Sequence, residues 1–100
     1  MSTKFKNILI TGASSGIGEA LALHYAAAGA ENLFLCGRNE ERLNKVAAEC
    51  AGRGAKVFAE ILDVTDREAA EKWVKKCAAA APLNLVIANA GVATVEETPE

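Results

Sequence analysis

The chain has 100 residues, of which 51% are hydrophobic and 24% are charged, and its formal net charge at pH 7 is -2. This composition predicts one globular domain or part of one, and it excludes an intrinsically disordered chain. The weakly acidic balance, without a run of lysine and arginine, argues against a nucleic-acid-binding surface. We expect a cytoplasmic protein without a membrane partner, because no apolar stretch reaches the roughly 20 residues that span a bilayer and the first residues do not resemble a signal peptide.

The cysteines are three in number and far apart in the sequence: Cys36, Cys50 and Cys77. No Cys-x-x-Cys motif is present, and His24 is the only histidine, so the sequence predicts neither a metal site nor a disulfide. We expect the thiols to be small buried hydrophobic groups in a reducing compartment.

Short apolar strands alternate with helical patterns along the chain. Apolar runs predict strands over residues 6–10, 33–36, 57–62 and 85–88. Helical periodicity predicts a first helix over about residues 16–28. A second helix is predicted from Asn39, as its N-cap, to the glycines at positions 52 and 54. A third helix is predicted to start at Thr65 with a capping box and to end at Pro82. The expected buried stripe of the first helix is Ile17, Leu21, Tyr25 and Ala28.

Strands that alternate with helices predict right-handed βαβ crossovers and a parallel sheet covered on both faces. The strands are continuous apolar runs, which fits burial on both sides of the sheet. The predicted fold class is α/β: a Rossmann-type, doubly wound parallel sheet in three αβα layers, truncated after the fourth strand. We expect the open edge of that strand to favour a homo-oligomer.

A glycine-rich segment joins the first strand to the first helix. Gly12 permits a tight turn, Gly16 lets the backbone approach a pyrophosphate, and Gly18 lets the helix pack closely on the strand. Such loops also serve as plain turns, but the strand before and the helix after meet the context of dinucleotide binding. Backbone N–H groups at the helix start favour a pyrophosphate. The candidate phosphate-binding residues are Thr11, Gly12, Ser14, Ser15, Gly16, Ile17 and Gly18.

The spacing of this segment, Thr-Gly-x-x-x-Gly-x-Gly, resembles the short-chain dehydrogenase/reductase family. Three further landmarks of that family follow in order: Cys36-Gly37-Arg38-Asn39, Asp63-Val64 and Asn89-Ala90-Gly91. The resemblance covers residues 6–91 and implies that residues 1–100 are the N-terminal part of a domain that binds a nicotinamide dinucleotide.

The end of the second predicted strand bears on which dinucleotide is bound. NAD-binding members of the family place an acid there, which binds the adenosine ribose hydroxyls. Here Gly37 stands at that place, and Arg38 follows 20 residues after Gly18. We expect the glycine to leave space and the arginine, with Asn39 beside it, to bind a 2′-phosphate, which predicts NADP(H) in preference to NAD(H). Alternatively, Arg38 is a solvated charge that pairs with Glu41 or another acid.

The two later landmarks are assigned by the same resemblance. Asp63 would meet the adenine amino group with the Val64 backbone beside it, although it could instead be a turn or capping aspartate before Thr65. Asn89 would steady the central sheet, Ala90 would line the cofactor, and Gly91 would leave room for the ribose and nicotinamide.

The chain departs from the family pattern at two positions near the fourth strand. Ala88 replaces the first asparagine of the usual Asn-Asn-Ala-Gly, and Asn84 stands where an aspartate commonly precedes the strand. These departures put local hydrogen bonding in doubt, not the fold.

Family members that reduce carbonyls use a serine and a Tyr-x-x-x-Lys pair. Tyr25, the only tyrosine here, is followed four residues later by Gly29, and no serine follows Ser15. We therefore assign no catalytic residue.

The predicted function is the NADP(H)-binding portion of an oxidoreductase that transfers hydride between NADP(H) and an alcohol or carbonyl substrate. The chain alone is predicted to be inactive. One alternative is a stand-alone, non-catalytic dinucleotide-binding module. Another is a methyltransferase, against which the wide glycine loop and Arg38 argue because both suit phosphate.

Overall fold

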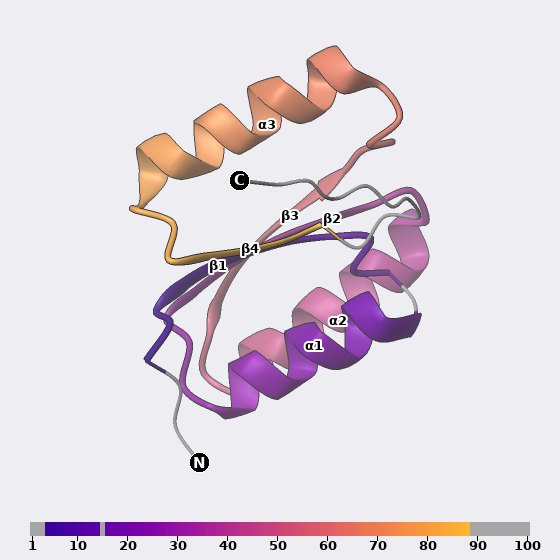
Figure 1. Ribbon diagram of the computed structural model, residues 1–100. Helices are drawn as coiled ribbons and strands as arrows, with labels where there is room; N and C mark the ends of the chain where they lie inside the picture. The colour runs from indigo at the N-terminus through magenta and orange to yellow at the C-terminus, as the bar shows by residue number, and fades with distance from the viewer. Residues whose placement is uncertain (1–3, 15, 89–100) are drawn as a thin grey trace.

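The computed structural model describes residues 4–14 and 16–88. Its elements follow in the order β1 (Asn7–Thr11), α1 (Gly16–Ala27), β2 (Asn32–Gly37), α2 (Glu40–Gly52), β3 (Lys56–Ile61), α3 (Arg67–Ala80) and β4 (Leu85–Ala88). The four strands form one parallel sheet in the order β3-β2-β1-β4. Helices α1 and α2 cover one face of the sheet and α3 covers the other (Figure 1). The prediction of a Rossmann-type, three-layer α/β fold is confirmed.

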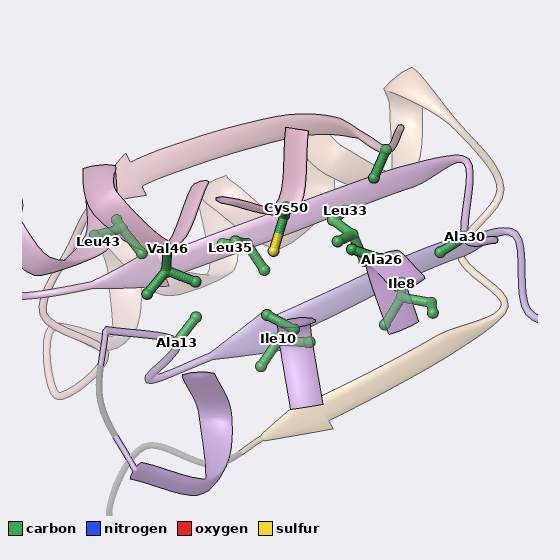
Figure 2. Close-up of a cluster of buried hydrophobic side chains, with 12 residues drawn as sticks. Ile8, Ile10, Ala13, Ala26, Ala30, Leu33, Leu35, Leu43, Val46 and Cys50 are labelled. Atoms are coloured by element: carbon green, nitrogen blue, oxygen red, sulfur yellow. The ribbon is translucent and has the colours of Figure 1, made fainter. Parts of the chain in front are cut away.

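The two central strands supply most of the core because their side chains are buried on both faces. Ile8 and Ile10 of β1 join Leu33 and Leu35 of β2 under α1 and α2, as Figure 2 shows. The intervening residues face the other way, toward a second cluster under α3 that contains Leu9, Phe34 and Trp73. Full burial of each large apolar side chain contributes about 1.5–3 kcal/mol. The continuous apolar runs therefore reflect a sheet with two covered faces, as predicted.

Helix α1 buries a different face from most of the predicted stripe, of which Ala28, directly after the helix, is buried. Its buried residues are Gly18, Ala22 and Ala26, whereas Ile17 is 68% exposed. Leu21 and Tyr25 lie half-buried at the margin of the cluster. Side chains with no more than one methyl group let the helix backbone come close to the sheet, so the larger side chains lie at its flanks. The size of the side chains that meet the sheet, rather than their hydrophobicity, determines which face of α1 is buried.

The helix caps agree with the sequence at α2 and differ at α3. The Asn39 side chain accepts a hydrogen bond from the backbone N–H of Arg42 at 3.0 Å, so the predicted N-cap is confirmed. At α3 the N-cap is Asp66, whose carboxylate accepts from the backbone N–H of Ala69 at 3.2 Å. The predicted start at Thr65 is wrong by one residue, because Thr65 lies inside a turn that the Asp66 N–H closes on the Asp63 carbonyl at 2.9 Å, and the helix begins after that turn.

Asparagines connect the amino ends of three strands. The Asn84 side-chain Oδ1 accepts the backbone N–H groups of Lys6 at 2.9 Å and Asn7 at 2.8 Å. The Asn84 N–H donates to the Asn7 carbonyl at 2.8 Å, and the Asn32 amide donates to the Asn7 side chain at 2.8 Å. The departure from the family pattern at position 84 therefore leaves hydrogen bonding intact. Asparagine supplies the acceptor that joins β4 to β1.

The outer strands of the described sheet expose large apolar side chains. Strand β3 starts at Lys56, one residue before the prediction, and exposes Phe58 and Ile61 by 43% and 46%. Strand β4 has the predicted bounds and exposes Val86 by 53%. Such edges favour association, and the expected oligomer stays a prediction. Within the described ranges, no helix is long and apolar enough to cross a bilayer.

Candidate functional site

Candidate residues from three strands meet at the carboxyl edge of the sheet. Because all strands are parallel, their last residues lie at one edge: Thr11 pairs in register with Ala88, and Gly37 pairs with Ile61. The glycine loop follows β1, Arg38 follows β2, and Asp63 follows β3 after one further residue. Ligands of open α/β sheets bind at this edge. Of the predicted site residues, Ser15, Asn89, Ala90 and Gly91 lie outside the described residues.

The glycine loop has a backbone that glycine makes possible. Gly12 and Gly16 have φ values of 65° and 59°, in the left-handed region that residues with a Cβ rarely adopt. A Cβ added to Gly16 would meet no atom within 4 Å among the described residues beyond its chain neighbours, so these residues leave open space beside the turn. Gly18 is buried at the start of α1, which agrees with its predicted packing role. Thr11 and Ser14 are half-buried, and the side chain of Ile17 is exposed.

The loop is attached to β2 by backbone and core contacts. The Ala13 side chain is fully buried, and its N–H donates to the Cys36 carbonyl at 2.9 Å. Burial raises the pKa of the Cys36 thiol, and the backbone of Gly12 opposes this with a smaller lowering effect. These contacts place the turn between β1 and α1 directly beside the end of β2.

Ser14 of the glycine loop occupies the place that a Cβ at position 37 would take, and the predicted room for a 2′-phosphate stays a prediction. A Cβ at position 37 would lie 2.8 Å from Oγ and 3.0 Å from Cβ of Ser14. Atoms in contact normally lie about 3.5–4.0 Å apart. Gly37 is therefore required by the close approach of Ser14. The sequence carries no signal for this contact, because the two residues are far apart along the chain.

Arg38 is exposed where β2 gives way to the turn before α2. Arg38 forms no ion pair within 4.0 Å with any of the residues that the structure describes. The ion pair seen among these residues joins Lys76 Nζ to Glu60 Oε1 at 3.6 Å. The alternative pairing with Glu41 is therefore not seen. Asn39 uses its side-chain oxygen for the cap of α2.

Asp63 has the geometry of a turn aspartate. The backbone N–H and the hydroxyl of Thr65 donate to Asp63 Oδ1 at 2.9 and 2.6 Å. The Asp66 N–H donates to the Asp63 carbonyl at 2.9 Å and closes the turn. The Thr65 hydroxyl is the largest cause of the lowered pKa of the Asp63 carboxyl, followed by the Thr65 N–H, and the charge of Arg38 adds a smaller effect. Val64 is half-buried and packs against the α3-side core.

The thiols of all three cysteines are buried in the core. Burial raises the pKa of Cys36, Cys50 and Cys77 to about 11 each, which keeps these groups protonated at neutral pH. Across residues 4–14 and 16–88, no three histidine, cysteine or acidic side chains come together as metal ligands. The prediction that the cysteines are buried is confirmed.

Comparison with known proteins identifies this architecture. Residues 6–100 match the short chain dehydrogenase family. Hydroxysteroid 11-beta-dehydrogenase 1-like protein of Xenopus tropicalis is 45% identical over 74 residues, which cover 73% of this chain and 26% of that protein.

Solved structures of similar proteins have the same arrangement of strands and helices. A short-chain type dehydrogenase/reductase from Mycobacterium marinum is 36% identical with a TM-score of 0.77, over 91% of this chain and 37% of that one. NAD+-bound xylitol dehydrogenase is 34% identical with a TM-score of 0.71, over 78% and 30%. A metagenomic short-chain oxidoreductase in complex with NADP is 29% identical with a TM-score of 0.77, over 88% and 40%.

The chain spans well under half the length of these proteins. The shared portion is nevertheless the one that contains the glycine loop and the carboxyl ends of β1 to β4, and the family match extends over nearly all of the chain. The chain therefore belongs to the short-chain dehydrogenase family.

Proposed function

We propose that residues 1–100 form the nucleotide-binding part of an oxidoreductase that transfers hydride between NADP(H) and an alcohol or carbonyl substrate. The observation that carries this proposal is the glycine loop at the carboxyl edge of the sheet. Gly12 and Gly16 adopt left-handed backbone angles there, and the position of a Gly16 Cβ is open space. An arginine without an ion pair among the described residues follows the neighbouring strand.

The residues at this edge fit the phosphates of a dinucleotide. The first backbone N–H groups of α1 have no partner within the helix, and the helix dipole adds partial positive charge at the same place. A pyrophosphate beside Gly16 would accept hydrogen bonds from these groups without meeting a side chain. Thr11, Gly12, Ser14, Ser15, Ile17 and Gly18 complete the proposed phosphate site.

The preference for NADP(H) over NAD(H) is supported by charge at the end of β2. The similar solved structures include both an NAD+-bound and an NADP-bound protein, so the preference is argued from this chain's own residues. No acid stands at the end of β2, and the exposed Arg38 follows, with Asn39 after it. A guanidinium binds phosphate through two parallel hydrogen bonds.

The remaining cofactor contacts follow from the family pattern. Asp63 and the Val64 backbone would meet the adenine, with the turn to Thr65 holding the carboxylate in place. Asn89, Ala90 and Gly91 would line the ribose and nicotinamide.

Bound NADP(H) would supply or accept the hydride, and the residues of this chain would bind and orient it. None of them is proposed to transfer a proton. The Tyr25 ring packs edge to face on Phe5, 6.4 Å between ring centres, and Phe5 precedes β1 at the opposite edge of the sheet. We therefore expect the 100-residue chain to bind the cofactor without turning over a substrate. We also propose a cytoplasmic homo-oligomer, and the exposed apolar side chains of β3 and β4 support the association.

Calorimetric titration with NADPH and NADH tests the proposal. Arg38→Ala should weaken NADPH binding by roughly 1.5–3 kcal/mol, the contribution of hydrogen bonds to a charged group, which is about ten- to hundredfold in Kd. NADH binding should be nearly unchanged. Arg53→Ala removes the same charge at the far end of α2 and serves as the control. Equal losses for both dinucleotides would contradict the role of Arg38, and absence of binding to the unaltered chain would contradict the function itself.

A further inference from the structure

Gly37 is a glycine for reasons of space and not of backbone conformation. It is buried at the end of β2, and the described glycines with positive φ lie elsewhere in the chain. A Cβ at this position would meet three atoms of Ser14: Oγ at 2.8 Å, Cβ at 3.0 Å and the backbone N at 3.4 Å. The first two distances are shorter than van der Waals contact of about 3.5–4.0 Å allows. Any side chain at position 37 therefore competes with Ser14 for the same space.

Rotation of the Ser14 side chain does not remove this conflict. A change of χ1 takes Oγ away from position 37, but Cβ moves only together with the backbone of the loop. That backbone is held at the neighbouring residue, because Ala13 is fully buried and donates to the Cys36 carbonyl at 2.9 Å. On the other side, the Gly37 carbonyl accepts the N–H of Leu62 at 2.9 Å. A side chain at position 37 must therefore displace either the glycine loop or the end of β2.

We propose that Ser14 and Gly37 form a steric pair that determines which dinucleotide this site accepts. In dinucleotide-binding folds, an acid about 20 residues beyond the glycine motif binds the ribose 2′-hydroxyl of NAD, and Gly37 stands 19 residues after Gly18. Ser14 occupies the space that the Cβ of such an acid needs. An acid at position 37 therefore requires the glycine loop or the end of β2 to shift unless position 14 carries no side chain. The identity of the ligand rests on the proposed function, whereas the steric conflict does not.

A double-mutant cycle on thermal unfolding tests the pair without any ligand. Overpacking by one methyl group destabilises a well-packed site, so Gly37→Ala should lower Tm by roughly 4–8 °C. Ser14→Gly removes both close atoms, Oγ and Cβ. In a chain that carries Ser14→Gly, Gly37→Ala should therefore lower Tm by less than half as much as it does in the unaltered chain. Ser14→Ala removes only Oγ and should leave most of the loss in place. Gly52→Ala is the matched control, because a Cβ at Gly52 meets nothing within 4 Å.

The cycle has outcomes that decide the steric pair. It is overturned when Gly37→Ala is as harmless as Gly52→Ala, or when its loss is the same in all Ser14 backgrounds. Should Gly37→Ala fail to fold, the variant that also carries Ser14→Gly decides: cooperative unfolding of that double variant supports the pair, and its failure to fold refutes it.

Dinucleotide titration then tests the effect on selectivity. Gly37→Asp combined with Ser14→Gly should bind NADH at least about tenfold more tightly than Gly37→Asp alone, a difference of about 1.4 kcal/mol. Ser14→Gly alone is titrated in parallel, so that any loss of affinity from its own place in the proposed phosphate site is measured separately. Equal NADH affinities of the Asp variants with and without Ser14 would overturn the selectivity role. If the unaltered chain binds neither dinucleotide, the proposed function fails, and the unfolding cycle still decides the steric pair.

Discussion

The Asn84 side chain is expected to stabilise the sheet far more than its exposed position suggests. Its Oδ1 accepts two backbone N–H groups, from Lys6 at 2.9 Å and Asn7 at 2.8 Å, and so connects the start of β1 to the segment before β4. Asn84→Ala removes the acceptor and leaves both donors to water. A net contribution of about 0.5–1.5 kcal/mol per hydrogen bond gives a loss of about 1–3 kcal/mol. The lower half of this range is expected, because the site is exposed and water can replace the acceptor.

Thermal unfolding followed by circular dichroism measures this loss. For a domain of this size, 1 kcal/mol corresponds to roughly 4–8 °C in Tm, so Asn84→Ala should lower Tm by about 4–16 °C. Asn84→Asp keeps an acceptor at the same place and should retain the Tm at neutral pH. Asn44→Ala removes the same side chain from the exposed face of α2 and should change stability by no more than about 0.5 kcal/mol. The reasoning is refuted if Asn84→Ala and Asn44→Ala give the same Tm, or if Asn84→Asp is as unstable as Asn84→Ala.

Two further predictions concern titrating groups. Thr65→Val should raise the pKa of the Asp63 carboxyl toward its usual value in an NMR titration, because the Thr65 hydroxyl is the largest cause of the lowered pKa. Since the folded pKa lies below the unfolded one, this stabilisation is present above pH about 3.9 and is lost as the pH falls further, so the Tm values of Thr65→Val and the unaltered chain should converge in acid. Burial raises the pKa of Cys36, Cys50 and Cys77 to about 11, so stability should fall as pH rises from the usual thiol pKa of about 8.5 toward that value. A Tm that stays constant over this alkaline range, or rapid reaction of all three thiols with an aromatic disulfide reagent in the folded chain, would contradict their burial.

The order and type of the elements could be predicted from sequence because local patterns determine them. The fourth strand, Leu85–Ala88, has the predicted bounds, since an apolar run between a proline-containing turn and small residues has few other solutions. The cap of α2 at Asn39 is likewise a local property of one side chain and the next turn. The start of α3 was harder to predict because Thr65 and Asp66 are both good caps. The deciding factor is the turn from Asp63 to Asp66, which holds Thr65 outside the helix and leaves Asp66 to accept from the Ala69 N–H.

The buried face of α1 could not be predicted from hydrophobicity. The stripe through Ile17 contains the larger apolar residues, yet the face that meets the sheet is built from Ala22 and Ala26. The distance between the helix and the sheet determines which face of α1 is buried. That distance depends on β1 and β2 as well as on α1. A pattern confined to one helix carries no information about it.

In the candidate site, too, local features could be predicted from the sequence and contacts between distant residues could not. The turn at Gly12 and Gly16 was predictable, because positive φ angles and the approach of a helix start are local requirements. The contact between Ser14 and Gly37 was not, because it depends on how a loop after one strand packs against the end of another. At position 37 the missing side chain makes room for the protein's own serine, a reason that the family resemblance did not indicate.

The two edges of the sheet have different tasks, and this separation makes the proposals independently testable. Side chains hold the amino edge, where Asn7, Asn32 and Asn84 set the register of three strands. That register in turn aligns the last residues of β1 and β4 at the carboxyl edge, where glycines leave the backbone accessible. A variant at the amino edge should therefore lower Tm while the folded molecules keep their NADPH affinity. Arg38→Ala should do the reverse, so a shared loss of stability and affinity in both variants would show that the edges are not separate.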